Sequence, residues 1–313
     1  MRVGVVLPVS EDESYQPTPY REVRRLALTA EETGLDSVWA ADHLLYQPDE
    51  ARPRGFWESW TLLSALAEAT ERIELGNLVL CTPFRNPGLQ AYMAATFEEI
   101  SGGRLVLGLG SGWHEPEFRA FGFEFDRRVS YFEESLAIIV PLLRGETVDQ
   151  SGEFVEGHGK LSPRGPRPDG PPILTASKGP RMHRLSARYA DRWNTAWYGH
   201  PAEPFWERRD GLYAACRQIG RDLHEIEINV GVDVVDGPQA GAESDLDRRL
   251  LAEPSALAEG LAAWQEQGVA EVMCRLDPAT AQMVERVARA AESVRAGAGS
   301  ATPARSDPVE SAQ

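Results

Sequence analysis

Asp42 and His43 are the first residues along the chain whose types and spacing suit proton transfer. They follow directly on the apolar run 37–40, so they lie where a predicted strand ends. A histidine exchanges a proton near neutral pH, and the carboxylate beside it can fix its tautomer. An aspartate that caps the next helix, beside an ordinary surface histidine, accounts for the same two residues. Both interpretations stay open, and Asp42 and His43 are the candidate catalytic residues.

A glycine-rich stretch follows another predicted strand. Gly108, Gly110 and Gly112, with Ser111 between the last two, leave the backbone free of side chains that would keep a flat ring or a phosphate at a distance. A tight turn from strand to helix explains the same glycines. The large aromatic residue Trp113 comes next, and at the end of a strand it favours a pocket for a ring. We therefore expect Gly110, Ser111 and Gly112 to contact a cofactor.

A third segment, residues 175–181, predicts an anion site. It leads from a predicted strand into a helix, and the backbone amides at a helix start attract negative charge. Lys178 and Arg181 add positive charge there. An ordinary capped helix with solvated charges is the alternative. The cofactor contacts predicted in this segment are Ala176, Ser177, Lys178, Gly179 and Arg181.

Strands and helices that alternate along the chain must position these segments. Between the strand-like runs, apolar residues recur every three or four positions, which is typical of helices with one buried face. Eight such units favour a (β/α)₈ TIM barrel, an α/β fold whose ligands lie at the carboxyl ends of the strands. A six-stranded open sheet with a small extra domain is the alternative. The eight runs are residues 3–7, 37–40, 73–80, 105–109, 173–175, 192–195, 227–235 and 271–276.

Two insertions interrupt the alternation, one after predicted strand four and one after strand seven. Residues 146–172 hold a predicted hairpin at Glu153, Phe154 and Val155 and then a proline-rich stretch, and we expect them to lie over the carboxyl-terminal face. Residues 236–254 form the second insertion, with a short helix. A single barrel domain is predicted for residues 1–296. The tail 297–313 is rich in Gly, Ala, Ser and Pro and is expected to be disordered.

Composition argues against several classes of function. A net charge of −16 over 313 residues disfavours nucleic acid as a partner. Cys81, Cys216 and Cys274 are widely spaced and form no CxxC pair, so we expect neither a disulfide nor a metal site. The first apolar run meets Pro8 too early for a signal peptide or a membrane span. We therefore expect a cytoplasmic protein that binds neither nucleic acid nor a membrane.

Taken together, four blocks resemble the bacterial luciferase-like monooxygenase superfamily. This barrel family holds flavin-dependent monooxygenases and oxidoreductases that use the deazaflavin coenzyme F420. The resemblance covers about residues 1–200, and the last third matches only in its alternation of strands and helices. The blocks follow the order of the family: GLDSVWAADH (34–43), FRNP (84–87) with MAAT (93–96), SGGRLVLGLGSGW (101–113) and ARYADRWN (187–194).

The resemblance implies a hydride transfer between coenzyme F420 and a small organic substrate. In deazaflavin members, the histidine that matches His43 lies near the reactive carbon of the ring, so His43 would manage the proton. Many members place a non-prolyl cis peptide behind the ring, and the matching bond joins Leu78 to Val79. Members often have a small residue where this chain has Leu78. They also commonly have a run of glycines where this chain has Ser177 and Lys178.

The resemblance also implies ligands and partners. The anionic tail of the coenzyme needs positive charge, for which Lys178, Arg181 and Arg184 are the nearest candidates. The alternatives are an FMN-dependent monooxygenase served by a separate cofactor reductase and a barrel that binds a cofactor without turnover. By analogy with related proteins, a homodimer through the second and third helices is expected. The substrate pocket is assigned to Trp39, Trp113, His114, Glu115 and Trp197.

Overall fold

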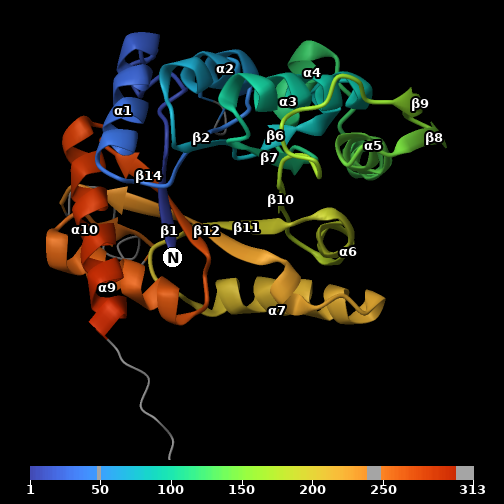
Figure 1. Cartoon of the computed structure of the whole chain (residues 1–313). Coiled ribbons are helices and arrows are strands. Elements are labelled where there is room, and N and C mark those ends of the chain that lie inside the picture. The colour runs from blue at the N-terminus through green and yellow to red at the C-terminus, as the bar shows by residue number, and fades with distance from the viewer. Residues whose placement is uncertain (48–50, 238–247, 301–313) are drawn as a thin grey trace, which may run out of the picture.

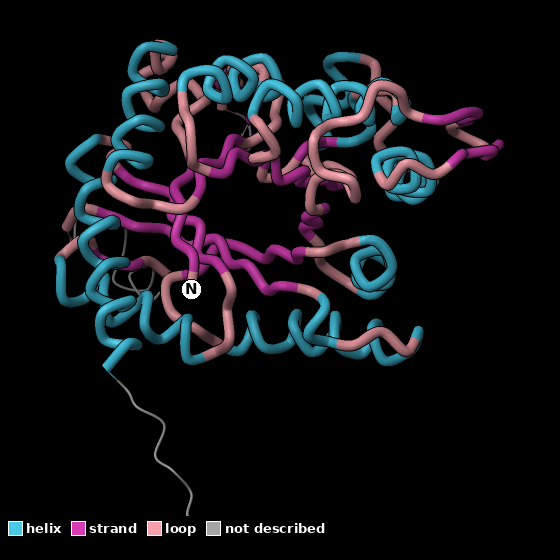
Figure 2. The backbone as a smooth tube through the Cα atoms, in the orientation of Figure 1, coloured by secondary structure: helices cyan, strands magenta, loops and turns pink. Residues whose placement is uncertain are grey.

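Eight parallel strands close into a barrel in the computed structural model, which describes residues 1–47, 51–237 and 248–300. The ring is completed where β1 (Arg2–Val6) pairs with β14 (Glu271–Asp277) and where β7 (Leu105–Gly110) pairs with β10 (Ile173–Ala176). The other barrel strands are β2 (Ser37–Ala40), β5 (Glu74–Asn77), β11 (Arg192–Tyr198) and β12 (Glu227–Val235). Figure 2 shows this ring of strands. The predicted (β/α)₈ barrel is confirmed, and the open sheet is wrong because the eight strands pair all the way round.

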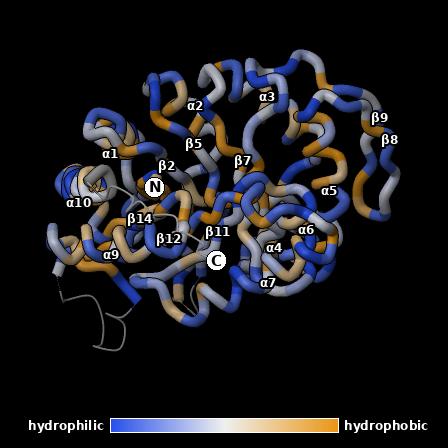
Figure 3. The backbone as a smooth tube through the Cα atoms, turned by 60° about the horizontal axis from the view of Figure 1, so that its bottom comes forward, coloured by the Kyte–Doolittle hydropathy of each residue, from blue (hydrophilic) through white to orange (hydrophobic). Residues whose placement is uncertain are grey.

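Helices surround the strands and bury one face each (Figure 1). In α1 (Tyr20–Glu32), the apolar residues spaced three and four positions apart are the buried ones. Helix α3 (Pro87–Ser101) begins behind the capping side chain of Asn86 and ends where Gly102 takes a φ of 64°. Figure 3 shows hydrophobic stretches on the strands and alternating stretches on the helices. The other helices are α2 (Ser59–Ala69), α4 (Glu115–Phe121), α5 (Arg128–Leu143), α6 (Pro180–Tyr189), α7 (Glu203–Ile219), α9 (Pro254–Glu266) and α10 (Ala281–Ser300), with 3-10 turns η1 (Thr82–Phe84) and η2 (Leu223–Glu225).

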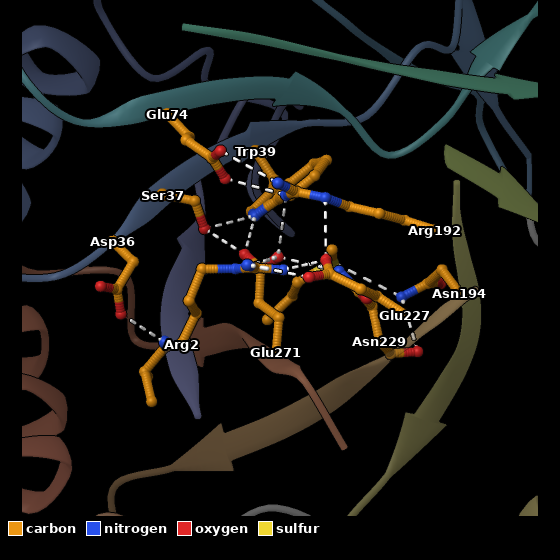
Figure 4. A network of polar contacts seen from close by, with 12 residues as sticks. Arg2, Asp36, Ser37, Trp39, Glu74, Arg192, Asn194, Glu227, Asn229 and Glu271 are labelled. Carbon is orange, nitrogen blue, oxygen red and sulfur yellow. Dashed lines mark hydrogen bonds and ion pairs between the residues drawn. The ribbon is translucent and has the colours of Figure 1, made fainter. Parts of the chain in front are cut away.

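Polar residues near the starts of the strands fill the amino-terminal end of the barrel (Figure 4). Glu271, the first residue of β14, is fully buried and accepts hydrogen bonds from Asn229 at 2.8 Å and from Trp39 at 3.2 Å. Arg2 and Arg192 lie 3.7 and 3.6 Å from its carboxylate. Burial raises the pKa of Glu271, against the opposing effect of a hydrogen bond and the two arginines. This network occupies the end of the barrel opposite to the predicted site.

The first insertion lies at the opposite face from the one expected. It holds the predicted hairpin, formed by β8 (Thr147–Ser151) and β9 (Glu156–Lys160), which lies beside α5 (Figure 1). Farther along, Arg167 forms an ion pair with Glu98 and donates to the carbonyl of Leu105 at the start of β7. The insertion connects a helix to the next strand, and such connections lie at the amino-terminal face of a barrel. The expectation that it covers the carboxyl-terminal face is therefore wrong.

Three other segments cover the carboxyl-terminal face. Residues 7–19 connect β1 to α1, and the connection from β2 to α2 contains a hairpin of β3 (Leu45–Tyr46) and β4 (Arg54–Gly55). The second insertion follows β12, and its strand β13 (Leu250–Leu251) pairs with β12. Residues 238–247 of this insertion lie outside the described residues, so the short helix expected in 236–254 is not assessed there.

The last element of the described residues is α10, which continues through Ser300. Residues 297–300, which were expected to belong to a disordered tail, are therefore helical, and residues 301–313 lie outside the described residues. Within the described ranges, no helix combines the length and the apolar character needed to cross a membrane.

Candidate functional site

A cavity of about 1010 Å³ opens at the carboxyl-terminal ends of the barrel strands. Barrel enzymes place their ligands at this face because the loops that follow the strands converge there. Four of the residues predicted from the sequence line the cavity. Each lies in or just after a different barrel strand: His43 after β2, Leu78 after β5, Trp113 after β7 and Trp197 in β11. The other predicted residues do not line it, and their positions are described below.

His43 is held by Glu117, a residue that the sequence did not single out. The Nδ1 atom of His43 lies 2.9 Å from Oε1 of Glu117, and the other carboxylate oxygen accepts from the amide of Leu44 at 2.9 Å. Glu117 lies in α4 and its side chain is 1% exposed. An ionised carboxylate only accepts, so Nδ1 donates to it and Nε2 remains able to take a proton. Nε2 has no hydrogen-bond partner within the described residues.

Asp42 has a structural role that differs from the one expected. Its carboxylate forms a two-pronged ion pair with Arg85, at 2.7 and 2.9 Å. It also accepts from the hydroxyl of Ser59 at 2.8 Å and from the amide of Cys81 at 2.9 Å. These partners belong to the segments after β2 and β5, so Asp42 ties the two segments together. The histidine beside it in sequence is paired with Glu117 instead.

The peptide bond between Leu78 and Val79 is cis, as predicted from the resemblance. It lies between β5 and the short strand β6 (Leu80–Cys81), and Leu78 lines the cavity. A Cβ added at Gly110 would come within 2.7 Å of a methyl group of Val79. The glycine therefore makes room for Val79 and does not itself line the cavity. A second non-prolyl cis bond precedes Trp197, and the sequence did not indicate it.

The rest of the glycine-rich stretch forms a buried turn. Gly112 has a φ of +72°, and a Cβ there would lie 2.6 Å from the ring of Phe118. Ser111 is buried, and its hydroxyl points to the carbonyl of Gly112 at 3.4 Å. Trp113 follows with 62% exposure, and its ring lies edge-on to that of His43 at 5.7 Å between centroids. The turn thus presents Trp113 to the cavity.

Three predicted pocket residues lie outside the cavity. Trp39 is completely buried below it, with its indole nitrogen bonded to Ser37 at 2.7 Å. His114 is buried and accepts from the amide of Gln47 at 2.9 Å, and burial lowers its pKa. Glu115 begins α4 and forms an ion pair with Arg119. All three side chains contact other parts of the protein, and their spacing in the sequence did not indicate these contacts.

The predicted anion segment places one lysine beside an arginine from another helix. Burial lowers the pKa of Lys178, and the charge of Arg208 in α7 lowers it further. Arg208 donates to the hydroxyl of Tyr198 at 2.7 Å, and neither cation has a carboxylate partner within the described residues. Arg181 is exposed and paired with Glu133 at 2.7 Å. The charge of Arg208 thus acts on Lys178, which lies just before the start of α6.

The remaining residues of this segment complete the turn into α6. Ala176 ends β10, and Gly179 precedes the helix with a φ of +86°. Ser177 is buried and its hydroxyl accepts from the indole of Trp193 at 2.6 Å. That hydroxyl is thus already engaged, and the free amides at the helix start remain the groups that can meet an anion.

Trp197 forms one wall of the cavity, and two partners fix its ring. The guanidinium of Arg275 lies 4.4 Å from the ring centroid, and Asp233 binds that guanidinium at 2.6 and 2.8 Å. Gly231 of β12 lies against the ring, because a Cβ there would approach it to 2.7 Å. The sequence offered no signal for this arrangement apart from the place of Trp197 at a strand end.

The first loop of the barrel is the largest part of the lining that sequence reasoning missed. Its stretch from Leu7 to Ser14 follows β1, and Glu11 in it accepts from the amide of Gly55 at 2.9 Å. Tyr46, Arg54 and Phe56 of the next loop also line the cavity. The position of the first loop, directly after a barrel strand, was the available signal.

The chain matches a family model over nearly its whole length. The model of the luciferase-like monooxygenase family matches residues 1–305, well beyond the region of the short motifs. A phthiodiolone/phenolphthiodiolone dimycocerosates ketoreductase from Mycobacterium sp. (strain JLS) is 31% identical over 242 residues, which cover 70% of this chain and 61% of that protein. An F420-dependent glucose-6-phosphate dehydrogenase from Amycolatopsis mediterranei (strain U-32) is 35% identical over 178 residues, 55% of this chain and 52% of that protein. This chain thus spans less than two thirds of the length of either relative.

Solved structures share the fold at lower identity. An F420-dependent secondary alcohol dehydrogenase in complex with an F420-acetone adduct has a TM-score of 0.78 at 17% identity, covering 94% of this chain and 99% of that one. A monooxygenase from Streptomyces bottropensis has a TM-score of 0.77 at 19% identity, covering 96% and 100%. The same barrel fold thus occurs in an F420-dependent dehydrogenase and in a monooxygenase.

Proposed function

Because this chain belongs to the luciferase-like monooxygenase family, we propose that it is a coenzyme F420-dependent oxidoreductase that acts on a small organic substrate. The observation that carries the proposal is the pair of His43 and Glu117, which gives the cavity a fixed histidine whose Nε2 has no partner among the residues that the structure describes. A bound deazaflavin supplies hydride chemistry, because it has carbon at the reactive position of the ring and reacts little with oxygen. The protein then has to position the substrate and manage one proton.

The residues present fit such a coenzyme in two places. The cavity is large enough for a tricyclic ring, with Leu78 and the indoles of Trp113 and Trp197 in its lining. Lys178 and Arg208 offer two positive charges without carboxylate partners in the described residues, beside the amides that start α6. A phosphate-bearing, polyanionic tail would be favoured there, since it would neutralise the two cations.

His43 would exchange the proton with the substrate oxygen through Nε2. Glu117 accepts from Nδ1 and stabilises the ring when it carries a second proton. Its own position is fixed by the amide of Leu44. Trp113 and Trp197 would limit the access of water to this face of the cavity. Arg85 and Asp42 contribute by holding together the loops that carry these groups.

A titration with each oxidised cofactor tests the proposal. The deazaflavin fluoresces, so its fluorescence on mixing with the purified full chain reports binding, and FMN is titrated in the same way. We expect coenzyme F420 to bind at least about tenfold more tightly than FMN, because these two cations favour the more highly charged ligand. Tight binding of FMN without binding of F420 would overturn the proposal.

An FMN-dependent monooxygenase is the second candidate function. Its support is the shared barrel of the monooxygenase from Streptomyces bottropensis. In that reaction a separate reductase supplies reduced flavin, and His43 would assist the attack on the substrate. Oxygen consumption that tracks substrate loss would favour this candidate. Cofactor binding without turnover of any alcohol or ketone would instead support a barrel that binds a cofactor but does not catalyse a reaction.

We also propose a homodimer and a cytoplasmic setting for the enzyme. The outward face of α3 carries exposed apolar side chains at Leu89, Tyr92 and Ile100, which fit a subunit interface. Cys81, Cys216 and Cys274 are free and buried, which fits a reducing compartment.

A further inference from the structure

The imidazole of His43 needs more than one contact to keep Nε2 in one place. Glu117 holds the ring at Nδ1, at 2.9 Å. The torsion that turns a histidine ring has broad, roughly two-fold preferences, so a hydrogen bond at one edge does not by itself fix the ring plane. The side chain of His43 is only 18% exposed, so other groups cover most of it. These groups decide how far the ring can turn.

Two aromatic rings of the cavity lining lie against the imidazole. The ring centroid of Phe56 is 5.2 Å from that of His43, with 55° between the planes. The ring of Trp113 is 5.7 Å away at 85°, and that of His114 is 6.3 Å away. Among the described residues, Phe56 thus makes the closest ring contact with His43.

Phe56 is also better fixed than Trp113. Its side chain is partly buried and packs against the main hydrophobic core of the barrel. Trp113 is 62% exposed. An exposed side chain keeps more of its rotamer freedom than one that is packed on several sides. The ring of Phe56 is therefore the firmer support for the imidazole.

The backbone of Phe56 is held by the first loop of the barrel. Phe56 forms an antiparallel bridge with Ser10 in the loop after β1. Beside it, the amide of Glu11 donates to the carbonyl of Gly55 at 2.9 Å. The carboxylate of Glu11 accepts from the amide of Gly55 at the same distance. The loop after β1 thus fixes the segment that carries Phe56 against His43.

We infer that Phe56 is a positioning residue for His43, whose ring packs against the imidazole, limits its rotation and so keeps Nε2 in one orientation in the cavity. The inference rests on the proposed function, in which His43 exchanges a proton with the substrate. Glu117 fixes the ring at one edge through a charged hydrogen bond, and Phe56 limits its rotation by contact. Such placement matters because a shift of about 1 Å in a reacting group can cost about 10²-fold in rate.

The tautomer of His43 tests this role in the full chain without a coenzyme. A carboxylate at Nδ1 keeps the proton of the neutral ring on that nitrogen, whereas a ring that turns freely shares the proton between both nitrogens. The two ¹⁵N chemical shifts of the ring distinguish these cases at pH 8.5, above the range in which histidines ordinarily take a second proton. The variant His43→Gln identifies the signals by their loss.

For Phe56→Ala we expect the two nitrogen shifts to approach each other by at least about a third of their wild-type separation. Phe56→Tyr keeps the ring and should keep the wild-type shifts. The matched control is Phe154→Ala, which removes a partly buried aromatic ring between β8 and β9 and should leave His43 unchanged. Wild-type shifts in Phe56→Ala would overturn the inference, because a loss of stability alone does not move the proton in the folded protein.

A second pair of variants tests the support of Phe56 without removing its ring. Glu11→Ala removes the acceptor for the amide of Gly55, so the shifts of His43 should change in the same direction, by a smaller amount. Glu13→Ala is the control, because it removes the same charge from the same loop and its side chain has no hydrogen bond or ion pair within the described part of the chain. Equal changes in the two variants, or none in Glu11→Ala, would overturn the inference. If the variants behave as expected but F420 does not bind, only the proposed function is rejected.

Discussion

His43 and Glu117 act as one unit although 74 positions separate them in the sequence. The carboxylate fixes the ring through Nδ1 and is itself fixed by the amide of Leu44, so the free nitrogen of the histidine has a defined place. A proton acceptor is useful only where its orientation matches that of the substrate. At the scale of single residues, the proposed proton transfer thus depends on a contact between the loop after β2 and helix α4.

Replacement of the histidine separates chemistry from binding. We expect His43→Ala to lower kcat by about 10²–10⁴-fold, because proton transfer by a positioned side chain contributes about that much. Its effect on F420 affinity should stay within about threefold, since Lys178 and Arg208 are elsewhere. Steady-state kinetics and a fluorescence titration measure the two effects. A variant with full activity would remove His43 from the mechanism.

Glu117→Gln tests the supporting carboxylate. The amide oxygen can still accept one hydrogen bond, but the charge that stabilises the protonated ring is lost, so kcat should fall about 10–100-fold. F420 affinity should change little. Glu115→Gln is the control, because Glu115 lies two positions away in the same helix and is paired with Arg119 at the surface. If Glu117→Gln retained the wild-type kcat, the histidine would not need the charge.

At the scale of elements, Gly231 of β12 sets the position of the cavity wall. A Cβ at this glycine would lie 2.7 Å from both the Trp197 ring and the Cβ of Ala196. We expect Gly231→Ala to push Trp197 into the cavity, to raise KM, and to lower stability by about 1–3 kcal/mol. Gly55→Ala is the control, because its nearest contact would be 3.7 Å. If KM and the melting temperature of Gly231→Ala were unchanged, the Trp197 ring could move aside without cost, and Gly231 would not set the position of the cavity wall.

The junction between α1 and β5 gives a pH-dependent test. Glu31 at the end of α1 accepts from the amides of Glu71, Arg72 and Ile73 at 2.9, 2.6 and 3.0 Å. Burial raises the pKa of Glu31, but these hydrogen bonds outweigh it and hold the pKa below the usual 4.5. A lowered pKa stabilises the fold above the unfolded value, and this stabilisation is lost as the pH falls through the folded value.

We therefore expect Glu31→Gln to lower the melting temperature by about 2–5 °C at pH 7. The difference from the wild type should shrink as the pH is lowered from 7 toward 3, because the protonated fraction of Glu31 rises as the pH falls toward its lowered pKa. Thermal melts at the two pH values measure it. Glu32→Gln, the exposed neighbour on α1, should show no such difference. A gap that stays constant between pH 7 and pH 3 would contradict the role of the carboxylate.

The elements were more predictable from the sequence than their contacts. The strand 227–235 was predicted with its observed bounds, because apolar residues recur at every second position from Ile228 to Val234. The insertion 146–172 was assigned to the wrong face, since loop composition does not say which end of a helix the loop follows. The pairing of His43 with Glu117 was missed because only the fold brings the loop after β2 against helix α4, whereas Asp42 was favoured for being adjacent in sequence.

At the scale of the whole molecule, the two ends of the barrel have opposite characters. The amino-terminal end is filled by the buried network around Glu271, whose charges are paired with arginines (Figure 4). The carboxyl-terminal end keeps unpaired groups of both signs, at Lys178 and at Glu13, among the described residues. The paired charges connect neighbouring strands, and we expect the unpaired charges to be the ones that meet ligands.

The outer face of the molecule predicts its assembly. Leu89, Tyr92 and Ile100 recur on one side of α3, which lies beside α2 (Figure 1), and each is about half exposed. Exposing an apolar face of this kind to water is unfavourable, and covering it with a second copy of the chain is favourable. We expect a dimer by sedimentation velocity at about 10 μM. Tyr92→Glu combined with Ile100→Glu should give monomers with unchanged secondary structure. Ile219→Glu, a comparably exposed position on α7, should remain dimeric. A monomeric wild type, or dissociation by Ile219→Glu alone, would place the interface elsewhere or remove it.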